Sequence, residues 1–136
     1  MNQRTIIFKN RIEEVERIAA FVEGVSEELD LQPAVVGSLQ LAIEEAVVNV
    51  INYAYPDRTE CDSSLMAKWD DTSLTFILSD SGVPFDPTRA ADPDLSLGLE
   101  ERPIGGLGIF LIKKIMNEVS YEYINSCNVL TMIKNL

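Results

Sequence analysis

The most informative absence in this sequence is histidine. The 136 residues contain none, which excludes histidine-activated nucleophiles and removes the commonest zinc ligand. Cysteine is almost as scarce. Cys61 and Cys127 are too few for a disulfide framework, so we expect both to be reduced thiols.

Positive charge is also scarce. Eleven Lys and Arg residues stand against 22 Asp and Glu residues, giving a net charge of −11. Nucleic-acid binders and proteins of anionic membranes need a basic surface, so the composition predicts neither activity. A phosphate-bearing ligand would need local help from backbone N–H groups, a helix N-terminus, a divalent metal or a few placed cations. A basic protein partner fits the charge, although excess acidity more often serves solubility.

Long apolar runs are missing as well. No run approaches the roughly 18 residues of a membrane span, and the chain does not open with the regions of a signal peptide. A content of 46% hydrophobic and 24% charged residues is typical of a soluble globular protein. We therefore expect one cytoplasmic domain covering residues 1–136, with no membrane and no direct nucleic-acid contact.

The order of the predicted elements indicates an α+β fold. Apolar periodicity predicts strands at 4–9, 60–69, 73–79, 118–125 and 128–134, and helices at 11–30, 33–55 and 106–116. Strands that follow one another as hairpins, with helices to cover one face, predict a two-layer α/β sandwich with a mostly antiparallel sheet and about three helices. Residues 80–106 are rich in Pro, Gly and Asp, and a loop this long is usually functional or mobile.

The second helix carries a polar sector on an otherwise apolar surface. At about 100° per residue, one face is formed by Val35, Leu39, Ile43, Ala46, Val50 and Ala54. The remaining sector holds Ser38, Glu45, Asn49 and Asn52. No Lys or Arg lies between Arg17 and Arg58, so Glu45 has no cation nearby in the sequence. Because a partly buried carboxylate without a partner is unfavourable, the pattern favours a cation supplied from outside the chain.

Three polar or glycine-rich clusters lie at element ends. Glu45 and Asn49 are one helical turn apart, and their oxygens suit Mg²⁺, although Glu45 is equally suited to act as a general base. Asp80-Ser81-Gly82 follows a strand, where a carboxylate can accept from an exocyclic amine. Gly105-Gly106-Leu107-Gly108 precedes a helix and can expose N–H groups to phosphate. Taken singly, the ordinary alternatives are a solvated stripe, a turn and a hinge; together, the three favour a nucleotide site.

These clusters resemble the nucleotide-binding motifs of the bacterial anti-sigma factor serine/threonine kinases, small members of the GHKL (Bergerat-fold, histidine-kinase-like) ATPase superfamily. The sequence EEAVVNVINYAYP resembles the N box of the family, DSGVPFDP its first glycine box, and GGLGIFLIKKIMNEV its second. The resemblance covers nearly the whole chain. Two positions depart from it: Tyr53 stands where many relatives have histidine, and the cation that often precedes the second glycine box is displaced to Arg102, which Pro103 follows.

The resemblance implies a role for each motif. Glu45 would be the catalytic base and Asn49 the Mg²⁺ ligand. Asp80 would receive the adenine amino group while Gly82 leaves room for the ring. The phosphates would be held by Gly106, Leu107 and Gly108, beneath a lid of about residues 86–104 from which Arg102 or Arg89 could reach the γ-phosphate. A polar contact to adenine is also expected near Asn128 or Thr131, and the residues alone leave that choice open.

The resulting hypothesis is a cytoplasmic, ATP- and Mg²⁺-dependent protein kinase that acts by partner switching. It would form a homodimer, sequester a sigma factor or similar target, and phosphorylate a Ser or Thr on a small STAS-type anti-sigma factor antagonist. One alternative is a catalytically weak or inactive module of the same fold that only binds nucleotide and sequesters its partner. Another is a histidine-kinase or gyrase-like ATPase, which the lack of a histidine phosphoacceptor disfavours. A purely structural role would leave the polar sector unexplained.

Overall fold

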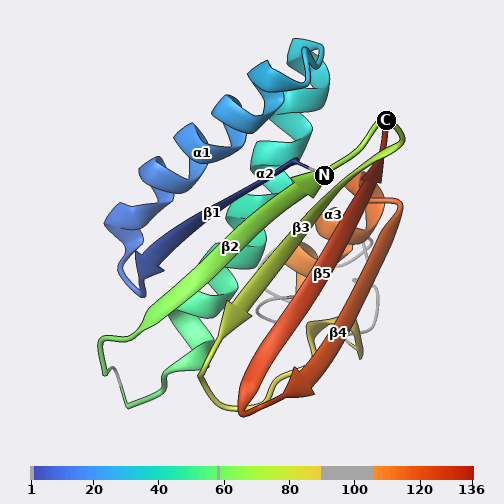
Figure 1. Ribbon diagram of the computed structural model, residues 1–136. Helices are drawn as coiled ribbons and strands as arrows, with labels where there is room; N and C mark the ends of the chain where they lie inside the picture. The colour runs from blue at the N-terminus through green and yellow to red at the C-terminus, as the bar shows by residue number, and fades with distance from the viewer. Residues whose placement is uncertain (1, 58, 90–105) are drawn as a thin grey trace.

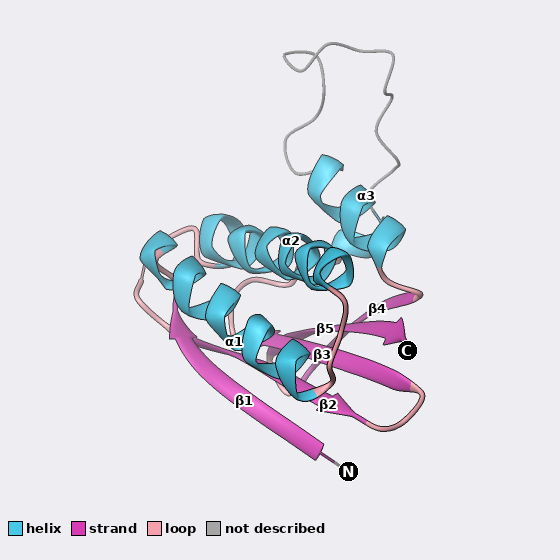
Figure 2. Ribbon diagram, turned by 90° about the horizontal axis from the view of Figure 1, so that it is seen from above, coloured by secondary structure: helices cyan, strands magenta, loops and turns pink. Residues whose placement is uncertain are grey.

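The computed structural model describes residues 2–57, 59–89 and 106–136, and it confirms the expected α+β fold. A five-stranded antiparallel sheet carries three α-helices on one face (Figures 1 and 2). The strands are β1 Asn2–Lys9, β2 Asp62–Trp69, β3 Ser73–Asp80, β4 Glu118–Ile124 and β5 Cys127–Asn135. The helices are α1 Val15–Glu28, α2 Pro33–Asn49 and α3 Gly106–Ile115, with short turns η1 Ile12–Glu14, η2 Val50–Ala54 and η3 Pro87–Arg89.

The sheet buries one face through strict alternation along its strands. Its order is β1-β2-β3-β5-β4, and every neighbouring pair is antiparallel. On β3, the residues Leu74, Phe76 and Leu78 point under the helices, while their neighbours in sequence lie on the opposite face. Leu130 and Met132 do the same on β5. Because side chains alternate in a strand, the parity of a position, odd or even along the strand, decides whether its side chain lies on the helix-covered side or on the open face. Parity therefore also decides which polar residues lie under the helices.

Helix α2 lies between α1 and α3 and contacts both (Figure 2). Pro33 occupies its first turn, where a missing N–H costs nothing. The residues that it buries are Leu39, Ala42, Ile43, Ala46 and Val47, at the spacing of one helical face. Val35 and Val50, which were expected on this face, are only half-buried. The buried face is therefore narrower than the composition of the helix suggests.

The length and composition of this helix correct one expectation. With its last turn, the segment Pro33–Ala54 spans 22 residues and is long and apolar enough to cross a membrane by those two measures alone. The expectation that no segment would qualify was therefore wrong. Core helices of soluble proteins pass the same test, and the buried side chains of α2 belong to the same core cluster as those of α1, α3 and the sheet.

The last turn of this helix is a π turn, which splits the predicted polar sector. From Val50 to Ala54 the chain winds as a π-helix, which has more residues per turn than an α-helix. Asn52 therefore leaves the sector of Glu45 and Asn49 and lines a separate hollow with Asn10. The expectation that Asn52 shares their sector is wrong. Asn49 and Tyr53 stay together on the other side.

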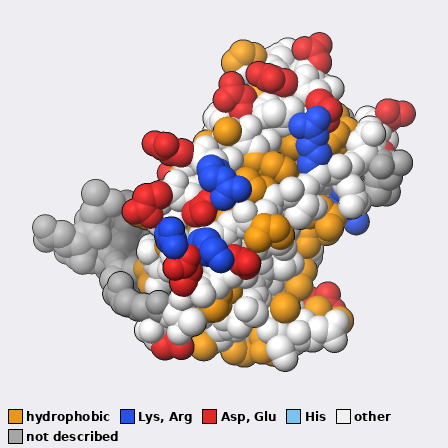
Figure 3. All heavy atoms as spheres, turned by 60° about the vertical axis from the view of Figure 1, so that its left-hand side comes forward, with side chains coloured by type: hydrophobic (Ala, Val, Ile, Leu, Met, Phe, Trp, Pro, Cys, Tyr) orange, Lys and Arg blue, Asp and Glu red, His pale blue; other side chains and the backbone are white. Residues whose placement is uncertain are grey.

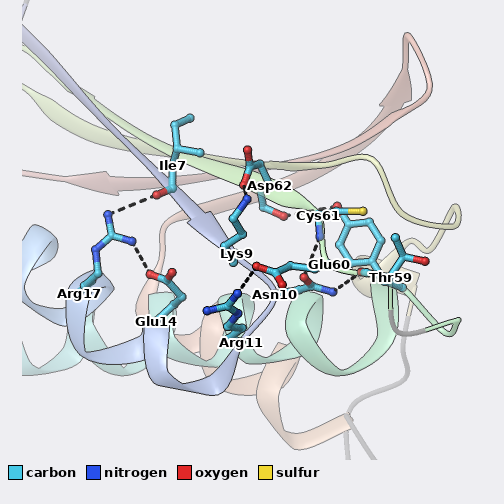
Figure 4. A network of polar contacts seen from close by, with 12 residues as sticks. Ile7, Lys9, Asn10, Arg11, Glu14, Arg17, Thr59, Glu60, Cys61 and Asp62 are labelled. Carbon is cyan, nitrogen blue, oxygen red and sulfur yellow. Dashed lines mark hydrogen bonds and ion pairs between the residues drawn. The ribbon is translucent and has the colours of Figure 1, made fainter.

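Polar contacts fasten the N-terminal edge of the sheet (Figure 4). Lys9 pairs with Asp62 at 2.7 Å, and Arg11 pairs with Glu60. The Asn10 side chain donates to the Thr59 carbonyl at 2.9 Å and accepts from the backbone N–H of Cys61 at 2.9 Å. These contacts tie β1 to the segment that leads into β2. Acidic and basic side chains are mixed on this face, with apolar surface between them (Figure 3).

Both cysteines of the chain, Cys61 and Cys127, are free thiols, as expected.

Candidate nucleotide site

A cleft opens between the C-terminal part of α2, the end of β3 and the start of β5. Its empty volume, counted into the open solvent at its mouth, is about 490 Å³. Its lining is mostly apolar and includes Ala46, Val50, Leu78, Ile112 and Leu130. Asn49 and Asp80, from two of the three predicted clusters, both line it. The fold therefore brings together residues that lie 31 positions apart in the sequence.

Asp80 forms the closed end of this cleft. It is the last residue of β3 and is only 6% exposed, because its position has the inward parity of Leu78. Its Oδ1 accepts two hydrogen bonds, from the backbone N–H of Gly82 at 2.9 Å and from the Asn128 side-chain amide at 2.9 Å. No described residue donates to Oδ2. That oxygen is therefore the one left to a ligand.

Asn128 continues the network from β5. Its amide nitrogen also donates to the Val83 carbonyl at 2.9 Å, and its Oδ1 accepts from the backbone N–H of Phe85 at 3.1 Å and from the Tyr121 hydroxyl. The pairing of Asp80 with Asn128 across the two strands places both side chains on the helix-covered side. Thr131 has the opposite parity and lies on the open face. The structure thus brings Asn128, and not Thr131, to the cleft.

Sequence reasoning missed Tyr121 and Phe85, which complete this end of the cleft. The Tyr121 hydroxyl accepts from the Phe85 N–H at 3.2 Å. Burial, opposed in part by that hydrogen bond and assisted by the nearby charges of Asp86 and Asp80, raises the pKa of Tyr121 above its ordinary value. Inward parity on β4, shared with Val119, is the sequence signal that could have identified this tyrosine.

Gly82 is required by a close approach of two backbones. A Cβ built on it would lie 2.2 Å from the Ala54 carbonyl oxygen, which accepts from the Val83 N–H at 2.9 Å. No side chain fits in that space. The predicted role of leaving room for a base ring stays a prediction, and the contact with Ala54 gives a separate reason for glycine here.

The other end of the site is formed by α2 and the start of α3. A Cβ on Gly108 would lie 2.9 Å from Glu45 Oε2 and 3.7 Å from Asn49 Nδ2. The first turn of α3, which has N–H groups without helical partners, thus lies against the Glu45–Asn49 pair. Neither side chain has a hydrogen-bond or ion-pair partner among the described residues. Glu44 is exposed, whereas Glu45 is half-buried, which supports the choice of Glu45.

Other predicted residues lie at the margin of the described structure. Arg102 and most of the predicted lid, including residues 90–105, lie outside the described residues. Gly106 and Leu107 form the first turn of α3. The backbone of Arg89 ends η3, and the Lys113 Nζ of α3 donates to the Thr88 carbonyl at 2.9 Å. The first described residues of the predicted lid are therefore held against α3.

The donor atoms at this end fit a magnesium–phosphate group better than a metal held by protein alone. In the described part of the chain, no group of three His, Cys, Asp or Glu residues could hold a metal ion. The pair Glu45 and Asn49 supplies one carboxylate and one amide beside open N–H groups. Mg²⁺ usually takes one or two protein ligands and completes its shell with phosphate oxygens and water.

Comparison with known proteins shows the family of this chain. Residues 8–134 match the family described as the histidine kinase-like ATPase domain. The serine/threonine-protein kinase BtrW of Bordetella bronchiseptica is 27% identical over 95 residues, covering 70% of this chain and 67% of that protein. The serine-protein kinase RsbW of Bacillus cereus is 25% identical over 124 residues, covering 88% and 77%.

Two solved structures share the fold. A Mycobacterium tuberculosis structure of RsbU and RsbW domains superposes with a TM-score of 0.70 at 12% identity, covering 98% of this chain but only 32% of the longer one. The SiaB–SiaC complex of Pseudomonas aeruginosa gives 0.56 at 13% identity, covering 96% and 89%. With the family match over nearly its whole length, this chain belongs to the histidine kinase-like ATPase domain family and resembles its RsbW-type members.

Proposed function

We propose that this protein binds ATP with Mg²⁺ and transfers the γ-phosphoryl group to a serine or threonine of a partner protein. The observation that carries the proposal is the meeting of Glu45, Asn49 and the Gly108 turn of α3. An acid and an amide without described partners lie beside the N-terminus of a helix, where phosphate is favoured. Asp80 closes the opposite end of the same cleft.

The two ends of the cleft would divide the nucleotide between them. The base would enter the apolar part, where Asp80 Oδ2 accepts from its exocyclic amine. The phosphates would lie toward α3, whose first turn begins at Gly106. Asn49 would hold Mg²⁺, which when bound neutralises phosphate charge and orients the transferring group. The cation Arg102 would assist at the γ-phosphate.

Glu45 would act on the incoming hydroxyl. Its carboxylate accepts the hydroxyl proton as the bond between that oxygen and the γ-phosphorus forms. The bond from the γ-phosphorus to the β–γ bridging oxygen breaks, and ADP leaves with the electron pair. Glu45 is half-buried and lies near Gly108 together with Asn49, which lines the cleft. Its carboxylate oxygens have no described partner and are not buried, so they are accessible to a second protein. A positioned general base of this kind contributes about 10²–10⁴-fold to rate.

We infer the partners of this protein from its net charge and from the relatives that it resembles. Phosphorylation would give a small STAS-type antagonist roughly two negative charges. A protein with a net charge of −11 would then repel it and be free to bind a sigma factor or similar target. We further propose a single cytoplasmic domain, with its lid at about residues 86–104, that works as a homodimer. A protein that binds nucleotide and sequesters its partner without transfer is the alternative.

Substitution of Glu45 separates these functions. In Glu45→Gln, we expect phosphoryl transfer from γ-labelled ATP to fall at least about 100-fold, while calorimetric ATP affinity stays within about threefold, because the amide keeps the shape of the side chain. The matched control is Glu44→Gln, which removes an exposed carboxylate one position earlier and should leave both measurements unchanged.

Two outcomes would contradict the proposal. Equal transfer by wild type and Glu45→Gln would remove Glu45 from the chemistry. Absence of any binding heat for wild type with saturating Mg-ATP would exclude the nucleotide site. ATP binding without transfer to any serine-bearing partner encoded beside this protein would favour the sequestering alternative.

A further inference from the structure

The geometry points to Asn128 as a positioning residue that sets the base selectivity of the cleft because its own hydrogen-bonding capacity is already used. This inference rests on the proposed function, since it takes the cleft to hold a nucleobase. It goes further by assigning selectivity to a side chain that offers the ligand nothing directly.

The capacity of the Asn128 amide is fully used within the protein. A carboxamide has two N–H donors and an oxygen that accepts two hydrogen bonds. Both donors are used, on Asp80 Oδ1 and the Val83 carbonyl, each at 2.9 Å. The oxygen accepts from the Phe85 N–H at 3.1 Å and from the Tyr121 hydroxyl. At 7% exposure, this buried amide has no donor left for a ligand.

The neighbouring polar groups are engaged in the same way. The Tyr121 hydroxyl donates to Asn128 and accepts from Phe85. Asp80 Oδ1 already accepts twice. No buried side-chain polar atom in the described structure lacks a hydrogen-bond partner, so Asp80 Oδ2, which has none, reaches accessible space. Among Asp80, Asn128 and Tyr121, which form the closed end of the cleft, Asp80 Oδ2 is therefore the one side-chain polar atom left free, and that atom is an acceptor.

A lone acceptor discriminates between bases by what they present at that edge. Adenine brings an exocyclic amine, which donates to Oδ2. Hypoxanthine carries a keto oxygen at the same position, and that oxygen would find no donor at the closed end of the cleft. Leaving a buried polar group unpaired is far more unfavourable than the net gain of a typical hydrogen bond. The network thus selects for the amine because the donors of Asn128 and Tyr121 are already used within the protein.

Removal of Asn128 would relax this selection and not merely weaken binding. In Asn128→Ala, Asp80 loses the donor that fixes Oδ1, so its carboxylate can rotate. The vacated space can admit water, which turns to donate or accept as the base requires. Adenine loses an oriented acceptor, whereas hypoxanthine gains a donor. The ratio of the two affinities should therefore fall.

Calorimetric titration with Mg-ATP and Mg-ITP tests this ratio. We expect wild type to bind ATP at least about tenfold more tightly than ITP, and Asn128→Ala to reduce the ratio to about one to threefold. Tyr121→Phe, which keeps the bond from Asn128 to Asp80, should reduce it less. The matched control is Thr131→Ala, on the opposite face of the same strand, which should keep the wild-type ratio. Equal losses for both nucleotides in Asn128→Ala would overturn the inference.

Hydrogen exchange without nucleotide provides a test that does not depend on the proposed function. The Phe85 amide is held by Asn128 and Tyr121, so its exchange should accelerate at least about tenfold in Asn128→Ala. The Val83 amide, held by the Ala54 carbonyl, is the internal reference. Unchanged Phe85 exchange would overturn the positioning role even if no nucleotide bound at all. Equal wild-type affinity for ATP and ITP would overturn the selectivity and leave the proposed function standing.

Discussion

The two ends of the cleft differ in how far their polar side chains are already hydrogen-bonded within the protein. At the end proposed to bind the base (the base end), Asp80, Asn128 and Tyr121 are joined to one another and to the backbone of residues 82–85. At the end proposed to bind the phosphates (the phosphate end), Glu45 and Asn49 have no hydrogen-bond or ion-pair partner among the described residues. At the first end, the side-chain polar atoms are hydrogen-bonded within the protein except for Asp80 Oδ2, whereas at the second end the polar groups of Glu45 and Asn49 are all available.

This difference matches what each end would bind. A neutral base is recognised by fixed hydrogen-bond geometry, which the protein can hold in advance. Phosphate and Mg²⁺ bring large charges of their own, and side chains that were already paired would have to give up their partners to meet them. Two glycines, Gly82 at the base end and Gly108 at the phosphate end, allow this contrast to be tested by adding one methyl group to each.

The largest effect on folding is expected at the base end. In Gly82→Ala, the new Cβ would lie 2.2 Å from the Ala54 carbonyl oxygen and 2.7 Å from the Ala54 carbonyl carbon. Backbone atoms cannot move aside as a side-chain tip can, so the loop or the π turn would have to shift. We expect the free energy of unfolding in urea to fall by about 3 kcal/mol. A change below about 0.5 kcal/mol would show that this end is not rigid.

The same substitution at the phosphate end should affect function instead. In Gly108→Ala, the Cβ would meet the tip of the Glu45 side chain at 2.9 Å, and that tip can swing away. Stability should change by less than about 1 kcal/mol. Displacing the proposed base should lower phosphoryl transfer about 100-fold. If Gly108→Ala lowers the free energy of unfolding as much as Gly82→Ala does, the contrast between the two ends is wrong.

Much of this arrangement was predictable because it depends on periodicity. Helical spacing placed Glu45 and Asn49 on one face, and the alternation of Leu130 and Met132 fixes the parity of β5. Applied one step further, that parity separates Asn128 from Thr131, since only the first shares the inward register. Hydrogen-bonding potential alone does not distinguish the two residues, because both side chains can donate and accept, whereas strand register does.

Other features depend on tertiary contacts that no spacing reveals. The π turn is a local departure from 3.6 residues per turn, and it removes Asn52 from the sector where regular winding placed it. The contact of Gly82 with Ala54 joins residues 28 positions apart. The role of Tyr121 depends on a hydroxyl that meets both a side chain and a backbone N–H.

A smaller effect is expected on α2 outside both ends. Gly37 is exposed, and a Cβ there would meet nothing within 4 Å. Glycine inside a helix is less stable than alanine by about 0.5–1 kcal/mol, so Gly37→Ala should raise the free energy of unfolding by that amount. Nucleotide affinity and transfer to a peptide substrate should not change. If transfer to a whole protein partner became slower while transfer to a peptide did not, Gly37 would belong to a docking surface for that partner.

The smallest effect concerns the pH dependence of the base end. Because the pKa of Tyr121 is raised in the folded protein above its ordinary value of 10.0, the folded state holds that proton more tightly than the unfolded chain. The resulting stability is complete below about pH 10 and is lost as pH rises through the folded-state pKa. Tyr121→Phe lacks this group, so its unfolding midpoint should fall less steeply above pH 10 than that of wild type. Parallel curves for the two proteins would mean that the hydroxyl titrates as in water, and the network at the base end would then be looser than its hydrogen bonds indicate.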